Sequence, residues 1–150
     1  MINHDEICQL IPHAGQMCLL DRVTRWDEDF IVCESISHKL SNNPLRRSDS
    51  LPSVNLIEYG AQAMAVHGGL LARKEGRALG DGFLAALRDV HISNMDVSNI
   101  SEKLTIEAEC IMSQGGNLIY KFLVRTGDTC IVYGRATVIE VDGSNMRDKA

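Results

Sequence analysis

The chain has 150 residues, of which 45% are hydrophobic, so it is long enough for one domain with a sizeable core over residues 1–150. The 15 Lys and Arg residues against 20 Asp and Glu residues give a net charge of -5, which argues against nucleic acid as a partner. The first 20 residues contain Asp5, Glu6 and Pro12 and no uninterrupted apolar segment, so we expect no signal or transit peptide and a cytoplasmic protein. The last residues, 143–150, have the composition of a frayed tail.

Two strands are predicted before residue 40, in the segments "MCLLDRV" (17–23) and "FIVCESIS" (30–37). The cysteines of the chain form an odd set of five without a CxxC pair. Such a set fits neither a disulfide framework nor a structural zinc site well. We therefore expect reduced cysteines, mostly as small core residues: Cys8, Cys18, Cys33, Cys110 and Cys130.

Four potential metal ligands follow one another near the N-terminus: His4, Cys8, His13 and Cys18. Their spacings of 4, 5 and 5 residues match no familiar zinc pattern. We therefore predict no metal site in this region.

A helix that is apolar on every side is predicted from Val54 to Ala72, because the polar residues in it are few: Asn55, Glu58, Gln62 and His67. One charged and three further polar groups make this segment a poor membrane span. A helix of this kind belongs inside a protein, so we expect no membrane partner.

The two ends of the predicted helix carry suitable residues. Pro52 fits the first turn, and either Ser50 or Ser53 can cap it. Arg73 and Lys74 fit the negative end of the helix dipole. Small residues would let a sheet or a second helix approach closely on several faces: Gly60, Ala61, Ala63, Ala65, Gly68 and Gly69.

A further strand, "FLAALRDVHI" (83–92), is predicted after the helix. Three strands then follow as a meander, "LTIEAECIM" (104–112), "LIYKFLVRT" (118–126) and "TCIVYGRATVIEV" (129–141). The connections "SQGGN" and "TGDT" are typical of hairpins. An α+β fold, in which an antiparallel sheet of five to seven strands wraps around one long helix, is the simplest arrangement that covers the helix.

Two motifs resemble the hotdog-fold 3-hydroxyacyl-carrier-protein dehydratases. "IPHAGQMCLLDRV" is similar to the entry strand of that family, and "LPSVNLIEYGAQA" is similar to its central helix. The resemblance runs from Ile11 to Val141 and is greatest for the predicted dehydratases of aryl-polyene pigment clusters. It implies a hotdog fold and the removal of water from 3-hydroxyacyl thioesters on an acyl carrier protein. The substrate would be held on the phosphopantetheine of the carrier, and the enzyme would use no cofactor or metal of its own.

The resemblance places Glu58 on the catalytic carboxylate of the family and Gln62 on its conserved amide. A carboxylate in an apolar helix costs several kcal/mol unless it is satisfied, so a working role explains its burial. The alternative is a Glu58 held by backbone groups or by an arginine such as Arg22 or Arg88. The family's histidine is absent, because the corresponding residue is Pro44.

Either another histidine serves as the catalytic base, or this chain does not carry out the chemistry unaided; two histidines are candidates. His13 lies in the turn "IPHAG", and His38 lies just before the segment that replaces the family's histidine loop. A base must first meet the substrate geometrically, so it is also open whether neither residue serves. His67 follows Glu58 by nine positions, about 180° around the helix, and is expected to pack elsewhere.

The helix start and a set of basic residues complete the predicted site. Backbone N–H groups around Pro52, Ser53 and Val54 would hold the thioester oxygen, and Gln62 would orient the carboxylate or a water. Carrier proteins are acidic, so a basic rim is expected, with Arg46, Arg47 and Arg88 as carrier contacts and Arg73, Lys74 and Arg77 as further candidates.

The resemblance further implies a homodimer, or a heterodimer with a related hotdog subunit, in which one subunit lends the histidine and the other the carboxylate. Two alternative functions stay open at this point. One is a hotdog acyl thioesterase, in which Glu58 would activate water. The other is a non-catalytic acyl-binding or partner subunit, which the loss of the histidine at Pro44 favours.

Overall fold

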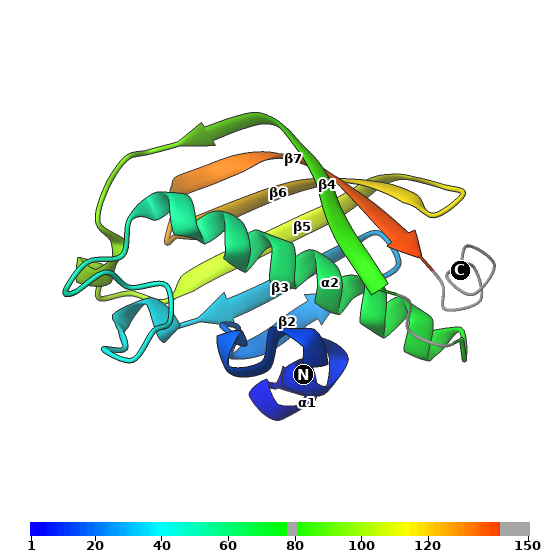
Figure 1. The fold of residues 1–150 in the computed structure, drawn as a ribbon, viewed down its shortest axis with the longest axis horizontal. Helices are drawn as coiled ribbons and strands as arrows, with labels where there is room; N and C mark the ends of the chain where they lie inside the picture. The colour runs from blue at the N-terminus through cyan, green and yellow to red at the C-terminus, as the bar shows by residue number, and fades with distance from the viewer. Residues whose placement is uncertain (78–80, 142–150) are drawn as a thin grey trace, which may run out of the picture.

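A seven-stranded antiparallel sheet curls around one long helix, α2, in the computed structural model, which describes residues 1–77 and 81–141 (Figure 1). The predicted tail, 143–150, lies outside this part, as do the side chains of Pro12, His13, Gln16, Asp81, Phe83 and Val141. The strands are β1 (Ile2–Asn3), β2 (Arg22–Trp26), β3 (Phe30–Ser35), β4 (Asp81–Ile92), β5 (Leu104–Gln114), β6 (Asn117–Thr126) and β7 (Thr129–Val141). The helices are α1 (His4–Leu10) and α2 (Leu56–Lys74), with 3-10 turns η1 (Pro12–Met17), η2 (Ser37–Lys39), η3 (Ser53–Asn55) and η4 (Val97–Asn99).

The strand order β1-β2-β3-β5-β6-β7-β4 confirms the predicted hotdog fold. β5, β6 and β7 form the expected meander, and Gly115, Gly116 and Gly127 supply the positive φ angles of its two turns. After α2 the chain crosses to the far edge of the sheet, where β4 pairs with β7 (Figure 1). The two edges of the sheet are therefore β1, which has two residues, and β4, which has 12.

The predicted strand at 17–23 begins later than expected. β2 starts at Arg22, and the buried Leu19 and Leu20 lie before it outside any strand. The reason is that the backbone of Met17 and Leu19 binds the side chain of Gln62 instead of a neighbouring strand. A tertiary contact thus overrides the strand propensity of this segment.

The predicted cap of the helix is also wrong. A 3-10 turn at Ser53–Asn55 precedes α2, and the N-cap Asn55 makes no side-chain cap bond. The hydroxyl of Ser53 instead donates to the carbonyl of Ser93 (2.7 Å) and accepts from the amide of Met95 (3.2 Å). These bonds fix the start of α2 against the loop after β4. None of the helices among the described residues is long and apolar enough to cross a membrane.

The cysteines differ from the prediction as well. Cys8 of α1 and Cys18 are joined by a disulfide, with their Cα atoms 5.9 Å apart, an ordinary separation for such a bond. The spacing of the cysteines in sequence contained no sign of this pair, because the tertiary fold returns the segment after η1 to α1. Cys33 is buried as expected, whereas Cys110 is half-buried and Cys130 is exposed.

Two glycines of α2 test how closely the helix sits on the sheet. A Cβ atom added to Gly60 would lie 2.8 Å from the ring of Phe122, whereas one added to Gly68 would meet no atom within 4 Å. We expect Gly60→Ala to lower the free energy of unfolding by about 1–3 kcal/mol through overpacking. We expect Gly68→Ala, the matched control, to raise it by up to about 1 kcal/mol through helix propensity. Urea titration of both variants checks this, and equal stabilities would contradict it.

Candidate active site

Glu58 lies in the first turn of α2 and is half-buried. Its Oε1 accepts a hydrogen bond from the Nε2 of Gln62, one turn further along the helix, at 3.1 Å. Among the described residues, no cationic side chain lies within 4.0 Å of the carboxylate; Arg22 lies beside Glu34 instead, at 3.8 Å. The structure thus shows a carboxylate that is oriented by an amide rather than neutralised by Arg22 or Arg88.

Gln62 is held in one orientation by the backbone of the segment before β2. Its Oε1 accepts from the N–H of Leu19 at 2.9 Å, and its Nε2 donates to the carbonyl of Met17 at 2.5 Å. The second hydrogen of Nε2 reaches Glu58, so both amide hydrogens are used. In the described part of the chain the other oxygen of Glu58, Oε2, makes no hydrogen bond.

Two serines hold this segment from its other side. The hydroxyls of Ser35 and Ser37 donate to the carbonyl of Leu19 at 2.6 and 2.8 Å. Leu19 is therefore fixed through its N–H by the helix and through its carbonyl by the end of β3 and by η2. The hydroxyl of Ser37 also lies 2.8 Å from the hydroxyl of Tyr59.

Tyr59, which follows Glu58 in α2, is a supporting residue that the sequence did not reveal. Its side chain is fully buried, and its hydroxyl accepts from the amide of Asn43 at 3.0 Å. Burial raises the pKa of Tyr59, so it stays a neutral hydrogen-bonding group. The position of Tyr59 next to Glu58 in a mostly apolar helix was the one sign in the sequence of a supporting role. The hydrogen-bond partners of the Tyr59 hydroxyl lie more than ten residues away in sequence, so the sequence did not identify them.

The two histidines predicted as candidate bases lie in different settings. His38 is fully buried in η2; its Nε2 donates to the carbonyl of Ile100 at 3.0 Å, and its Nδ1 has no partner among the described residues. The ring of His38 is closed to solvent, and this burial lowers its pKa, so the ring is neutral. The backbone of His13 belongs to η1, and its side chain lies outside the described part. The assignment of a base to either residue stays a prediction.

His67 fastens α2 to the sheet, on a different side of the helix from Glu58. Its Nε2 donates to the carbonyl of Asp27 at 2.8 Å, so its Nδ1 accepts from the hydroxyl of Tyr120 at 2.7 Å. The ring is fully buried, and burial lowers its pKa. Both ring nitrogens are engaged, which gives His67 a structural role.

The helix start is less open than the sequence suggested. Ser53 is 1% exposed, and its N–H donates to the carbonyl of Met95 at 2.9 Å. Pro52 has no N–H and is half-buried, whereas Val54 is 52% exposed. The structure therefore presents Val54 at the surface and keeps Ser53 for internal bonds.

The predicted carrier contacts remain free of ion pairs within the part of the chain that the structure describes. Arg46 is half-buried in the loop before α2, and Arg47 and Arg88 are exposed. Two of the further candidates form ion pairs, Lys74 with Glu28 and Arg77 with Glu75 and Glu140.

A groove of about 710 Å³ lies on the outer face of the sheet, and its lining includes Phe30, Glu107, Lys121 and Tyr133. Glu58 does not line it, because α2 covers the opposite, inner face. A substrate that reaches Glu58 therefore does not enter through this groove.

Comparison with known proteins places this site in a family. Residues 5–148 match the ApeP-like family, the ApeP dehydratases. The chain belongs to this family. It is therefore a hotdog dehydratase. No curated protein matches the chain in sequence.

Solved structures show the same fold. The dehydratase heterocomplex ApeI:P from Xenorhabdus doucetiae contains a chain that is 20% identical, with a TM-score of 0.83 and 95% of both chains covered. A thioesterase from Haemophilus influenzae is 12% identical, with a TM-score of 0.65 over 95% of this chain and 92% of the other. A hypothetical thioesterase with coenzyme A from Streptococcus pneumoniae is also 12% identical, with a TM-score of 0.59 over 81% and 85%. At these identities the likeness shows the fold alone.

The buried neutral His67 predicts a pH dependence of stability. The folded-state pKa lies below the ordinary value of about 6.5, so the stabilisation is complete above that pH and is lost as the pH falls below it, because the unfolded chain binds the proton first. We expect His67→Gln to flatten the fall in unfolding free energy between about pH 7.5 and 5.5. Tyr120→Phe, which keeps the buried imidazole, should retain the slope. Urea titrations at several pH values measure it, and identical slopes for wild type and His67→Gln would count against this role.

Proposed function

We propose that this chain removes water from 3-hydroxyacyl groups carried on an acyl carrier protein, in aryl-polyene or fatty-acid type synthesis, and that Glu58 transfers a proton in this step. The observation that supports the proposal most is the oriented carboxylate: one oxygen is held by Gln62, and the other makes no hydrogen bond among the described residues. A single oxygen in a fixed position suits a group that exchanges a proton with one site on a substrate.

Dehydration requires two proton handlers. A base removes a proton from C2 of the acyl group, and an acid protonates the hydroxyl that leaves from C3. Glu58 serves the leaving hydroxyl, and an imidazole serves C2, since its ordinary pKa lies near neutral pH. His38 is enclosed in this structure, so we assign the imidazole to His13 or to a neighbouring subunit.

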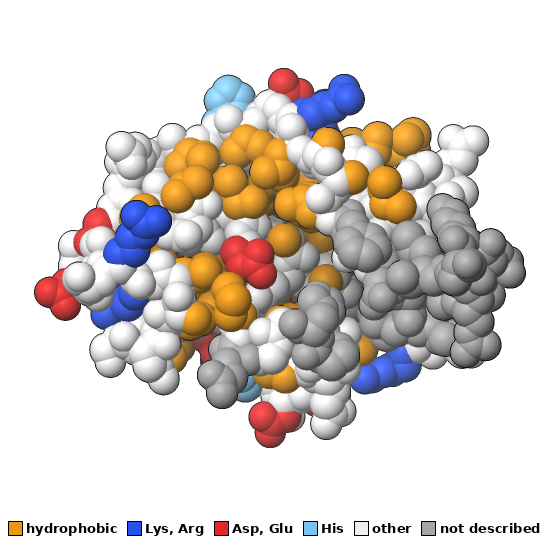
Figure 2. All heavy atoms as spheres, viewed as in Figure 1, with side chains coloured by type: hydrophobic (Ala, Val, Ile, Leu, Met, Phe, Trp, Pro, Cys, Tyr) orange, Lys and Arg blue, Asp and Glu red, His pale blue; other side chains and the backbone are white. Residues whose placement is uncertain are grey.

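A second hotdog subunit would complete the site. β4 is an edge strand of 12 residues, and such an edge offers unpaired backbone groups to another strand. Its Leu84 and Leu87 are 43% and 39% exposed, and Figure 2 shows hydrophobic side chains gathered on the face that carries α2 and β4. Because ApeI:P is a heterocomplex of dehydratase chains, we propose that the partner is a related subunit.

A carrier protein would deliver the substrate. An acidic carrier protein would dock on Arg46, Arg47 and Arg88, which make no ion pairs among the described residues. The phosphopantetheine arm would bring the acyl chain to Glu58, and no metal or further cofactor enters the reaction. We place this work in the cytoplasm.

Glu58→Gln tests the catalytic role. The substitution keeps the size of the side chain and leaves an amide at the position that Gln62 contacts, yet removes the proton-transferring group. We expect a loss of at least about 100-fold in dehydration rate. The assay follows the ultraviolet absorbance of the new conjugated double bond, with purified chain and partner and a 3-hydroxyacyl carrier protein. Glu75→Gln, at the other end of α2, is the matched control and should keep the wild-type rate.

The same assay separates the competing functions. Release of a free thiol instead of a conjugated product would identify a thioesterase. Full activity of the complex with Glu58→Gln would show that this chain is a non-catalytic subunit. Activity of the isolated chain would place the imidazole within this sequence.

Substitutions on β4 test the proposed partner surface. We expect Leu84→Lys and Leu87→Lys to shift this chain from its complex with the related subunit to the monomer, because each buries a charge in an apolar contact. Met112→Lys on β5 is the control, since that side chain is 45% exposed and its strand lies away from β4 in the sheet. Sedimentation velocity measures the assembly, and unchanged dimers in both β4 variants would exclude this surface.

A further inference from the structure

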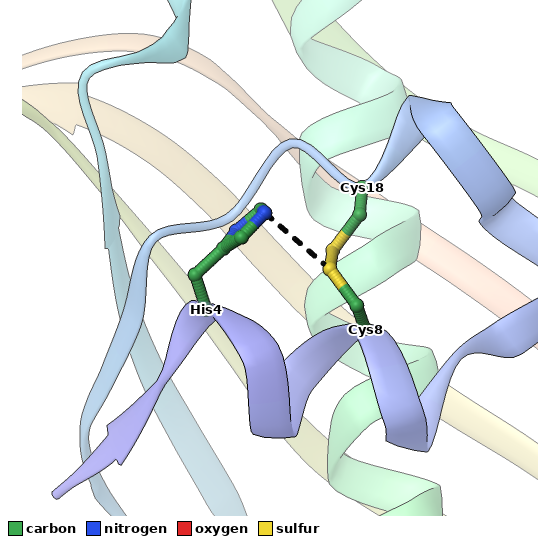
Figure 3. A group of neighbouring side chains, drawn as sticks. All are labelled: His4, Cys8 and Cys18. Atoms are coloured by element: carbon green, nitrogen blue, oxygen red, sulfur yellow. Dashed lines mark hydrogen bonds between the residues drawn. A yellow bond between two sulfur atoms is a disulfide. The ribbon is translucent and has the colours of Figure 1, made fainter.

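His4, Cys8 and Cys18 form a compact group at the N-terminus, with ligand atoms that all lie within 4.8 Å of one another (Figure 3). His4 and Cys8 lie one turn apart on α1, and Cys18 faces them from the segment after η1. The Nδ1 of His4 donates to the carbonyl of Leu20 at 2.7 Å, which fixes the tautomer. The unprotonated Nε2 therefore faces the sulfur of Cys8 at 3.4 Å.

The position of Cys18 connects this group to the active site. Cys18 lies between Met17 and Leu19, the two residues whose backbone holds the amide of Gln62. Gln62 in turn orients Glu58. A bond that anchors Cys18 to α1 therefore restrains the segment that sets the carboxylate.

We propose that Cys8 and Cys18 are a redox-sensitive pair, oxidised by low-molecular-weight disulfides, whose bond fixes the segment Met17–Leu19 and so holds Gln62 and Glu58 in place. The catalytic consequence rests on the proposed function, whereas the restraint itself does not. Both sulfur-bearing residues are half-buried and so within reach of a small disulfide, unlike Cys33, which is fully buried. In a reducing compartment such a bond is a reversible state rather than a permanent link.

The exchange proceeds in two steps. In the reduced chain the Nε2 of His4 accepts the proton of the Cys8 thiol, and the thiolate attacks one sulfur of the small disulfide, which releases one small thiolate. The Cys18 thiol then loses its proton to solvent and attacks the Cys8 sulfur of the mixed disulfide, which releases the second small thiolate. Both released thiolates take up a proton, so two protein thiols and one disulfide yield one protein disulfide and two small thiols.

The first test measures the bond itself. The full chain is equilibrated in mixtures of oxidised and reduced glutathione, the free thiols are alkylated, and peptides are identified by mass spectrometry. We expect Cys8 and Cys18 to become linked to each other while Cys33, Cys110 and Cys130 stay free thiols that can be alkylated, with Cys130→Ser as the control that leaves the Cys8–Cys18 bond unchanged. His4→Gln should slow bond formation at least about fivefold by removing the base. Persistent thiols at Cys8 and Cys18, or a reduced chain that retains zinc on this group, would overturn the proposal.

The second test measures the restraint. We expect reduction to accelerate hydrogen exchange of the Leu19 amide at least about fivefold, because this amide opens when its segment moves. Cys8→Ser with Cys18→Ser should exchange fast under both conditions, and the dehydration rate of the wild type should fall at least about threefold on reduction. Equal exchange in oxidised and reduced wild type would refute the restraint. Since exchange needs no substrate, faster exchange on reduction in a chain whose complex with its partner lacks dehydratase activity would support the restraint and refute the proposed function separately.

Discussion

The amide of Gln62 is the contact on which the site depends. It joins α2 to the backbone of Met17 and Leu19 and reaches Glu58 with its remaining hydrogen. Gln62 is buried, and leaving a buried amide or peptide group without a hydrogen-bond partner costs about 1–3 kcal/mol. The same interaction therefore stabilises the N-terminal segment and gives the carboxylate a defined direction.

Around this contact, a second layer of hydrogen bonds keeps the segment from moving. Ser35 and Ser37 bind Leu19 from the sheet side, and Tyr59 and Asn43 continue the network under the loop before α2. Such networks rigidify a site when each member is satisfied. The segment that holds Gln62, and through it Glu58, is thus supported by a network of neighbouring polar side chains.

The sequence predicted those parts of the structure that follow from local periodicity. Strict alternation identified β5, β6 and β7, and the near absence of charge identified α2 and singled out Glu58. The start of β2 was not predicted correctly, because in the segment before it the backbone N–H of Leu19 binds the side chain of Gln62, 43 residues away, instead of a neighbouring strand. The Cys8–Cys18 bond and the network of Tyr59 were missed for the same reason, since they join residues that only the tertiary fold brings together.

The unequal edges of the sheet have a consequence for assembly. β1, with two residues, offers few backbone groups and is followed at once by α1, whereas β4 offers twelve residues. A related subunit that paired with this chain along β4 would use the long edge and leave only the short β1 edge at each outer end. Further growth by strand addition would then stop after one pairing, which would keep the assembly finite.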